Sequence, residues 1–171
     1  TVINAGVCGA LVEGVKRGSV FSIKSVADGA RPERSPLLNL GAAPDLERRT
    51  LVTVHEPVLH PKKRSAMAGA GELVDMEGYA VADVCAEHHI PCLLIKGVTD
   101  WADEKGKTDI REHLDFCSQA LAGHVIHVLN SRTGTPAPLG RKLLRFTRVE
   151  HTVFSLPLLF AGAWLGAGGG C

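Results

Sequence analysis

Residues 92–98 read CLLIKGV, a short apolar run that is typical of a strand buried in the centre of a parallel sheet. An Ile-Pro pair precedes it and ends a predicted helix over residues 76–89, for which Asp75 is the expected N-cap. After the run, residues 99–108 predict a polar loop, and the apolar stripe of residues 109–130 predicts a long helix. The first helix is expected to bury one face, made of Ala80, Val81, Val84, Cys85 and His88.

Further strands are expected on the N-terminal side of this segment. Residues 1–10 predict a buried strand that runs into a glycine-containing turn, and residues 19–27 alternate as a half-buried strand does. Proline, glycine and charge make residues 28–45 an exposed loop, followed by a short strand at 51–54. Residues 62–71 predict a short helix. Strands that alternate with helices predict an α/β domain.

In α/β sheets, ligands bind beyond the carboxyl ends of the strands. That rule selects two predicted loops, Gly6 to Gly9 and residues 99–103. We therefore expect the functional site between these two segments.

Composition excludes several classes of function. The net charge is +1, from 19 basic and 18 acidic residues, and aromatic residues are few, so a nucleic-acid partner is not expected. Five cysteines without a CxxC pair argue against a disulfide framework or a zinc cluster and indicate reduced thiols in a cytoplasmic protein. His88 and His89 lack an HExxH context, and His124 and His127 share a helix face without an evident carboxylate partner. We expect no metal and no cofactor.

The composition changes near the C-terminus. Residues 131–140, SRTGTPAPLG, are typical of a linker between domains. Residues 141–171 begin with basic side chains and end in a charge-free run from residue 152, which predicts a truncated first membrane helix that tethers a cytoplasmic domain. An amphipathic or core helix and an apolar tail are the alternatives. Because Thr1 stands where a start methionine is expected, we interpret the chain as a fragment.

Three segments carry candidate chemistry: NAGVCGA (4–10), VDMEGYAVA (74–82) and IKGVTDWAD (95–103). Singly, each has an ordinary explanation, since Glu77 can complement a helix dipole and Asp100 can cap the next element of the chain. Together they resemble the purine nucleoside phosphorylase and methylthioadenosine/S-adenosylhomocysteine nucleosidase superfamily over residues 1–130. The most specific marks are Met76 with Glu77 and, about twenty residues later, Thr99 with Asp100. The resemblance implies an incomplete mixed sheet flanked by helices.

The resemblance also implies roles for these residues. Glu77 resembles the glutamate that accepts hydrogen bonds from the ribose hydroxyls, and Met76 the methionine that packs on the ribose. Asp100 resembles the general acid that protonates N7 of the purine, and an aspartate there is similar to enzymes that take 6-aminopurines. The catalytic residue is thus expected to be Asp100. Thr99, which precedes it, is expected to contact substrate.

The remaining expected contacts are weaker. The loop from Gly6 to Gly9 resembles one that passes close to base and ribose, but Val7 and Cys8 stand where the family often has a hydroxyl residue and alanine. Val58 and Leu59 align with residues that line the base pocket, and ordinary core residues are the alternative. Trp101 either shelters the pocket or covers the edge of the sheet.

The implied function is cleavage of the N-glycosidic bond of a purine nucleoside of the methylthioadenosine, S-adenosylhomocysteine or aminofutalosine type, by hydrolysis. Phosphorolysis and a degenerate module that only binds nucleosides are the alternatives. Family members are homo-oligomers, so we expect one here. Residues 145–168 resemble the opening of UbiA-type membrane prenyltransferases. This second resemblance adds two hypotheses: that the tail is the functional part of the chain, and that a polypeptide joining a nucleosidase to a prenyltransferase serves menaquinone synthesis.

Overall fold

The computed structural model describes residues 1–32 and 35–133. Within these residues, six strands form one mixed sheet in the order β3-β2-β4-β5-β1-β6. The strands are β1 (Val2–Ala10), β2 (Val20–Asp28), β3 (Leu38–Asn39), β4 (Arg48–Thr53), β5 (Leu73–Asp75) and β6 (Cys92–Asp100). The helices are α1 (Pro61–Met67), α2 (Gly78–Glu87) and α3 (Gly106–Thr133). The predicted α/β class is confirmed.

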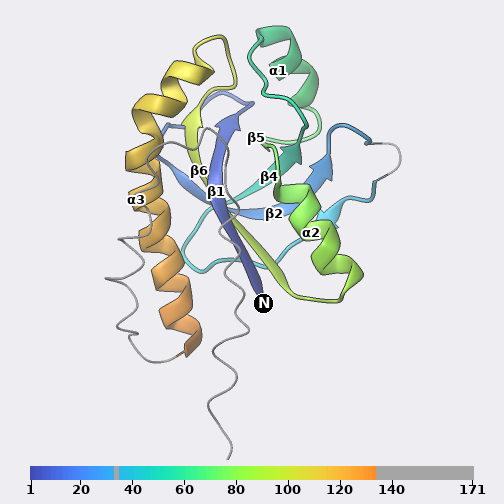
Figure 1. The fold of residues 1–171 in the computed structure, drawn as a ribbon, viewed down its shortest axis with the longest axis vertical. Helices are drawn as coiled ribbons and strands as arrows, with labels where there is room; N and C mark the ends of the chain where they lie inside the picture. The colour runs from blue at the N-terminus through green and yellow to red at the C-terminus, as the bar shows by residue number, and fades with distance from the viewer. Residues whose placement is uncertain (33–34, 134–171) are drawn as a thin grey trace, which may run out of the picture.

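The sheet closes on itself through β2. Residues 20–22 of this strand pair antiparallel with β6, and residues 22–28 pair parallel with β4. Strand β1 lies between β6, to which it is parallel, and β5, to which it is antiparallel. The helix α3 covers one flank of this curved sheet, and α1 and α2 lie on the other (Figure 1).

Side chains of β6 alternate between two apolar clusters. Leu93 and Ile95 pack with Leu121 of α3, whereas Leu94 and Val98 face the cluster that contains Tyr79 and Ala82 of α2. Burial on both faces explains why the run of residues 92–98 is almost uniformly apolar. The central strand predicted from that run is confirmed, and it extends two residues further, to Asp100.

Three predictions about strands and loops were wrong. Residues 6–9 are not a loop but the second half of β1, where backbone pairing with β6 continues as far as Gly9 and Asp100. The strand β2 is buried on both faces and not half-buried, since Phe21 and Ile23 on one face and Ser22 on the other are each at most 5% exposed. The predicted loop at 28–45 contains β3, which pairs with Ser25 and Val26 of β2.

The helix predictions need smaller corrections. Residues 73–75 form β5, so α2 begins at Gly78 and not at Met76. The buried face of α2 is also different from the predicted one, since Val84 is 55% exposed. That face instead comprises Gly78, Tyr79, Ala82 and Cys85. The long helix α3 continues to Thr133, so the first three residues of the predicted linker are helical.

The expectations for residues 134–171, including most of the linker and the UbiA-like membrane segment, lie outside the described residues. Among the residues that are described, no helix is both long and apolar enough to cross a membrane. Of the cysteines among the described residues, Cys8, Cys85, Cys92 and Cys117 are free thiols.

Candidate active site

The candidate site lies where β1, β5 and β6 run side by side. Gly9 of β1 is paired with Asp100 of β6 on one side and with Val74 of β5 on the other. The chain continues from β5 directly into Met76 and Glu77. The sheet therefore brings together, through β1, the two segments that carried the predicted acid and the predicted ribose ligand.

Asp100 ends β6 and is 6% exposed. Its Oδ1 accepts a hydrogen bond from the Thr99 hydroxyl (2.8 Å), and its Oδ2 accepts one from the Ala102 amide (2.9 Å). Burial raises the pKa of this carboxyl above its ordinary value of 3.8, the charges of Asp109 and Asp103 raise it further, and the two hydrogen bonds oppose the change. A buried carboxyl with a raised pKa is suited to donate a proton.

The backbone around Asp100 is shaped to surround one of its oxygens. Ala102 is buried and has φ of 51°, a left-handed conformation that costs on the order of 1 kcal/mol for a residue with a Cβ. Two glycines flank Oδ2 closely: a Cβ on Gly9 would lie 2.9 Å from it, and a Cβ on Gly106 would lie 3.3 Å from it. The carboxyl thus occupies space that other side chains at these positions would fill.

Glu77 occupies the N-cap position of α2, and its side chain makes no capping hydrogen bond to the helix. It is half-buried, and Met76 beside it is 40% exposed. The start of the helix is capped from elsewhere, because the Gly78 amide donates to Asp75 Oδ2 (2.9 Å) and the Tyr79 amide donates to Thr53 Oγ1 (2.8 Å). Asp75 was predicted as the N-cap residue, but the N-cap is Glu77, and Asp75 binds the first helical amide from two residues before the cap.

Of the other predicted contacts in this region, Cys8 and Thr99 lie near Asp100, whereas Val7 does not. Cys8 is buried, and burial raises the pKa of its thiol well above 9.0, with Lys96, Asp75 and Asp100 as its charged neighbours. By contrast, the Val7 side chain packs in the cluster on the α3 side of the sheet. Thr99 is 1% exposed, and its hydroxyl also lies 3.4 Å from the Cys8 carbonyl, to which it can donate.

Val58 and Leu59 behave differently although they are adjacent. Val58 is 4% exposed and belongs to a core cluster with Val74 and Ala102. Leu59 is half-buried, and its Cδ2 lies against Gly106, on the same side as Asp100 Oδ2. Leu59 is therefore the one of the two that borders the acid.

Sequence analysis did not predict two groups of charged residues near the site. Lys96 forms an ion pair with Asp75, with its Nζ 2.7 Å from Oδ2. The sequence does contain an indication of this pair, since Lys96 is the one charged residue in the apolar run CLLIKGV. Arg17 forms the second grouping: it lies over the Trp101 ring at 4.2 Å and pairs with Asp109 at 2.8 Å.

Trp101 is anchored as well as covered. Its indole N–H donates to the Val15 carbonyl (2.9 Å), and the ring is 37% exposed. The residue therefore joins the segment after β1 to the segment after β6.

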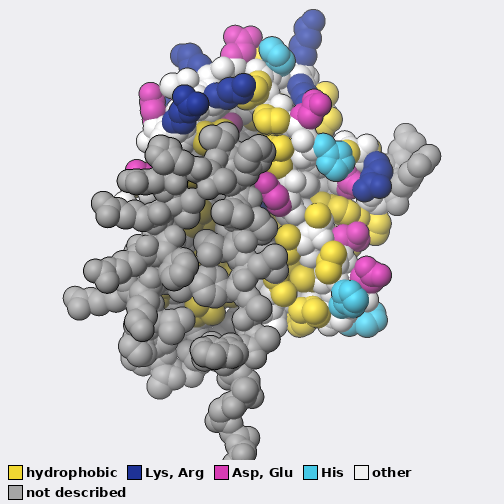
Figure 2. Space-filling model, viewed as in Figure 1, with side chains coloured by type: hydrophobic (Ala, Val, Ile, Leu, Met, Phe, Trp, Pro, Cys, Tyr) yellow, Lys and Arg dark blue, Asp and Glu magenta, His cyan; other side chains and the backbone are white. Residues whose placement is uncertain are grey.

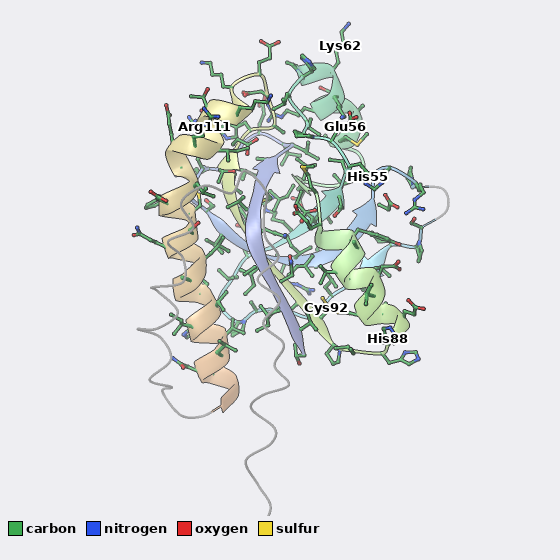
Figure 3. The ribbon with its side chains drawn as sticks, viewed as in Figure 1. His55, Glu56, Lys62, His88, Cys92 and Arg111 are labelled. Atoms are coloured by element: carbon green, nitrogen blue, oxygen red, sulfur yellow. The ribbon has the colours of Figure 1, made fainter. Side chains whose placement is uncertain are left out.

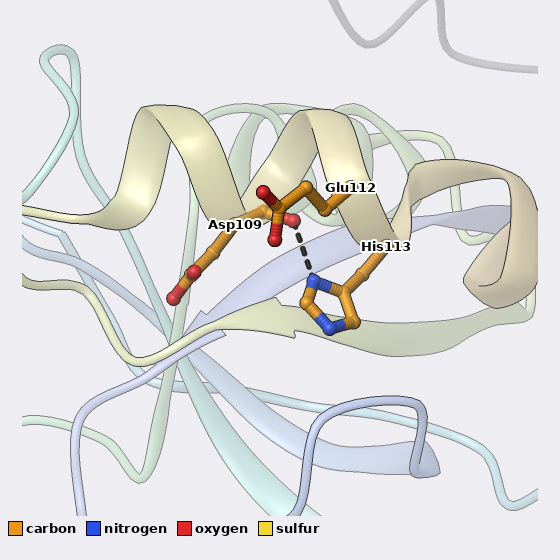
Figure 4. A group of neighbouring side chains, drawn as sticks. All are labelled: Asp109, Glu112 and His113. Atoms are coloured by element: carbon orange, nitrogen blue, oxygen red, sulfur yellow. Dashed lines mark hydrogen bonds between the residues drawn. The ribbon is translucent and has the colours of Figure 1, made fainter.

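One group of potential metal ligands lies at the start of α3. The ligand atoms of Asp109, Glu112 and His113 lie within 4.8 Å of one another, and His113 Nδ1 is 2.8 Å from the Asp109 carbonyl oxygen (Figure 4). Arg17 already provides a cation for Asp109. Elsewhere, His127 lies 3.2 Å from Asp45, a carboxylate partner that the sequence pattern did not reveal.

A separate cavity of about 240 Å³ lies at the other end of β6. Its lining is mainly apolar and includes Leu38, Leu40, Ala82, Ala86, Ile90 and Cys92. Cys92 lies beside the C-terminal end of α2, far along the molecule from Arg111 in the first turns of α3 (Figure 3). Apolar side chains are visible on the α2 side of the surface (Figure 2). Val84 of α2 and Ile90, which lines the cavity, are exposed. Neither Asp100 nor Glu77 lines this cavity.

Comparison of the sequence with known proteins identifies a family. Residues 33–130 match the sequence model of the phosphorylase superfamily. A 5′-methylthioadenosine/S-adenosylhomocysteine nucleosidase of Buchnera aphidicola is 33% identical over 82 residues, which cover 48% of this chain and 34% of that protein. The chain thus spans about a third of the length of the curated relatives that it matches.

Solved structures share the fold. The apo 5′-methylthioadenosine nucleosidase of Arabidopsis thaliana is 28% identical, with a TM-score of 0.68 over 78% of this chain and 62% of that one. The native futalosine hydrolase of Helicobacter pylori is 18% identical, also with a TM-score of 0.68, over 75% of this chain and 67% of that one. At that lower identity the likeness concerns the fold alone.

Proposed function

Because the chain belongs to the phosphorylase superfamily, we propose that it forms the purine- and ribose-binding part of an enzyme that cleaves the N-glycosidic bond of a purine nucleoside. The observation that carries this proposal is Asp100, a buried carboxyl whose pKa is raised by burial at the point where three strands meet. A module that only binds nucleosides has no need of a protonated acid in this position.

The proposed chemistry depends on the charges that develop during cleavage. As the bond between ribose and purine lengthens, positive charge grows on the sugar and negative charge on the departing base. Asp100 donates its proton to N7 of the purine, which neutralises the base as it leaves. General acid catalysis of this kind contributes roughly 10²–10⁴-fold in rate.

Glu77 is the proposed acceptor for the 2′ and 3′ hydroxyls of the ribose. A carboxylate makes charge-assisted hydrogen bonds to hydroxyl groups and favours the nearby cationic sugar electrostatically. Met76, 40% exposed, is available to pack against the ribose, and Leu59 and Asp100 both lie close to Gly106. Thr99 then acts through Asp100, since its hydroxyl is already committed to that carboxyl.

We further propose that water, and not phosphate, is the second reactant. The curated relative and the Arabidopsis thaliana protein carry the names of nucleosidases, which supports hydrolysis. Their named substrates are methylthioadenosine and S-adenosylhomocysteine, so a purine nucleoside modified at the 5′ position is the proposed substrate class. An aspartate as the acid favours the 6-aminopurine members of that class.

Two conservative substitutions test the proposed roles in the full-length protein. Asp100→Asn removes the proton donor but preserves shape, so we expect turnover to fall by roughly 10²–10⁴-fold while nucleoside binding is retained. Glu77→Gln removes the charge that binds the ribose, so we expect both binding and turnover to weaken. Steady-state kinetics and calorimetric binding separate the two patterns.

The matched control is Glu104→Gln, which neutralises an exposed carboxylate four residues after Asp100. We expect this variant to keep the turnover of the unmodified protein. Full activity in Asp100→Asn would show that the acid has been assigned to the wrong residue.

A further inference from the structure

The Lys96–Asp75 ion pair is buried to an unusual degree. Lys96 is 1% exposed and Asp75 is 5% exposed, and the ammonium lies 2.7 Å from Oδ2 of the carboxylate. Removing two charges from water is unfavourable, and replacing such a pair with apolar residues of similar size is often neutral or stabilising. Stability of the fold alone therefore does not account for the pair.

Asp75 uses both of its oxygens to hold the turn that leads into α2. Oδ1 accepts the Thr53 hydroxyl (2.6 Å), and Oδ2 accepts the Gly78 amide (2.9 Å) together with Lys96. Thr53 Oγ1 in turn accepts the Tyr79 amide (2.8 Å). These bonds fix the two backbone amides that come directly after Glu77.

The packing leaves no room for a side chain at Gly78 in this turn. A Cβ on Gly78 would lie 2.7 Å from Leu51 Cδ2 and 2.8 Å from Asp75 Oδ2. Glu77 is therefore held between a fixed residue two positions before it and a fixed residue directly after it. The ammonium of Lys96, 2.7 Å from Oδ2, holds the Asp75 carboxylate in this orientation.

Lys96 also connects the two halves of the site. It lies on β6, four residues before Asp100, whereas its partner Asp75 ends the strand that leads to Glu77. Gly6 of β1 lies between these strands, and a Cβ there would sit 3.4 Å from Lys96 Nζ. The absent side chain at Gly6 lets the lysine reach across β1 to Asp75.

We propose that Lys96 is a positioning residue for ribose recognition, which acts through Asp75 to place the carboxylate of Glu77. This inference rests on the proposed function, cleavage of a purine nucleoside. Lys96 does not itself touch the substrate in this scheme. Its loss moves the ribose acceptor and leaves the proton donor in place, so recognition of the 2′ hydroxyl is the property that changes.

The test compares a purine ribonucleoside with its 2′-deoxy counterpart in the full-length protein. The variants are Lys96→Met, Lys96→Arg and the double variant Lys96→Met with Asp75→Asn. The control is Lys24→Met, which removes an exposed lysine from β2. The values of kcat/KM for both nucleosides, the thermal stability and the pH dependence of kcat are measured for each.

We expect Lys96→Met to lower the preference for the ribonucleoside about tenfold, the effect of losing one charge-assisted hydrogen bond, and to do so mainly through KM. Lys96→Arg keeps the charge and recovers the preference. The double variant recovers stability, because no unpaired charge remains, but does not recover the preference. The alkaline limb of the pH profile, which belongs to Asp100, stays in place, and Lys24→Met changes nothing.

A preference for ribose that returns together with stability in the double variant would assign the pair a structural role and overturn the inference. If Lys96→Met does not fold, the double variant and Lys96→Arg decide the question. An unmodified protein that cleaves neither nucleoside refutes the proposed function and this inference with it. Cleavage with an unchanged preference in every variant refutes the inference alone.

Discussion

Asp100 is the residue on which the proposed chemistry depends, because two opposing influences set its protonation. Burial and the neighbouring charges of Asp109 and Asp103 favour the neutral acid, whereas hydrogen bonds from Thr99 and Ala102 favour the carboxylate. Burial is the largest of these influences, so the pKa is raised. The acid therefore remains protonated to a higher pH than an exposed aspartate does.

The first prediction concerns the charge beside this acid. Asp109→Asn removes a like charge that raises the pKa of Asp100, and it frees the Arg17 cation that Asp109 now binds. Both changes favour the carboxylate form of Asp100 and lower its pKa. Because the protonated form is the active one, activity is lost as pH rises through that pKa. We expect the alkaline limb of the kcat profile to move to lower pH.

The control for this shift is Glu112→Gln, one turn further along α3, since Glu112 is exposed and is not among the groups that shift the pKa of Asp100. Its pH profile is expected to match that of the unmodified protein. A limb that stays in place in Asp109→Asn would mean that another group limits the reaction at high pH.

At the residue scale, sequence reasoning selected Glu77 and Asp100 as candidates through their spacing and their resemblance to a family. It could not identify the residues that position these two side chains, because those residues act through contacts across the sheet. Lys96 is an unexpected charge in an apolar run, but only its pairing with Asp75 gives that charge a meaning. The left-handed backbone of Ala102 has no signal in the sequence at all, since glycine is the residue that usually adopts it.

At the scale of elements, β5 determines how the site is assembled. This strand has three residues and lies between β4 and β1, so it carries the chain from the core straight to Glu77. Its brevity hid it from the sequence pattern, and the predicted helix was extended backwards in its place. The buried face of α2 was also predicted wrongly. The strands β2, β3 and β4 all contact this helix, so the set of residues that it buries depends on the curved sheet and not on the helical pattern alone.

The second prediction concerns the close approach of β1 to Asp100. In Gly9→Ala, the new Cβ would meet Asp100 Oδ2 at 2.9 Å and atoms of Ala102 and Val74 at 3.3 Å. We expect a loss of about 1–3 kcal/mol in the free energy of unfolding, which is the usual range for overpacking, and a loss of activity as the acid is displaced. Urea denaturation and steady-state kinetics measure the two effects.

Gly123→Ala is the matched control in α3. A Cβ at this exposed helical position meets nothing within 4 Å, so the substitution is expected to stabilise the protein by roughly 0.5–1 kcal/mol and to leave activity unchanged. Equal stability and activity in Gly9→Ala and the unmodified protein would show that β1 can move away from Asp100 without consequence.

At the scale of the whole molecule, the closure of the sheet places the site. The strand β2 pairs with both β4 and β6, which curves the sheet and brings β1, β5 and β6 together around one interior. Alternation of strands and helices predicted the α/β class, but it could not predict this mixture of parallel and antiparallel pairs. Such pairings join residues far apart in the chain, as β2 and β6 are, and local patterns do not encode them.

The central claim is hydrolysis of a purine nucleoside, and its most direct test is release of the free base by the full-length protein. Chromatography would follow adenosine, methylthioadenosine, S-adenosylhomocysteine, futalosine and its 6-amino relative, each with and without phosphate. We predict base release from a 6-aminopurine nucleoside at the same rate whether or not phosphate is present. Release only with phosphate would contradict hydrolysis, and release from none of the nucleosides would contradict the assignment of an enzyme.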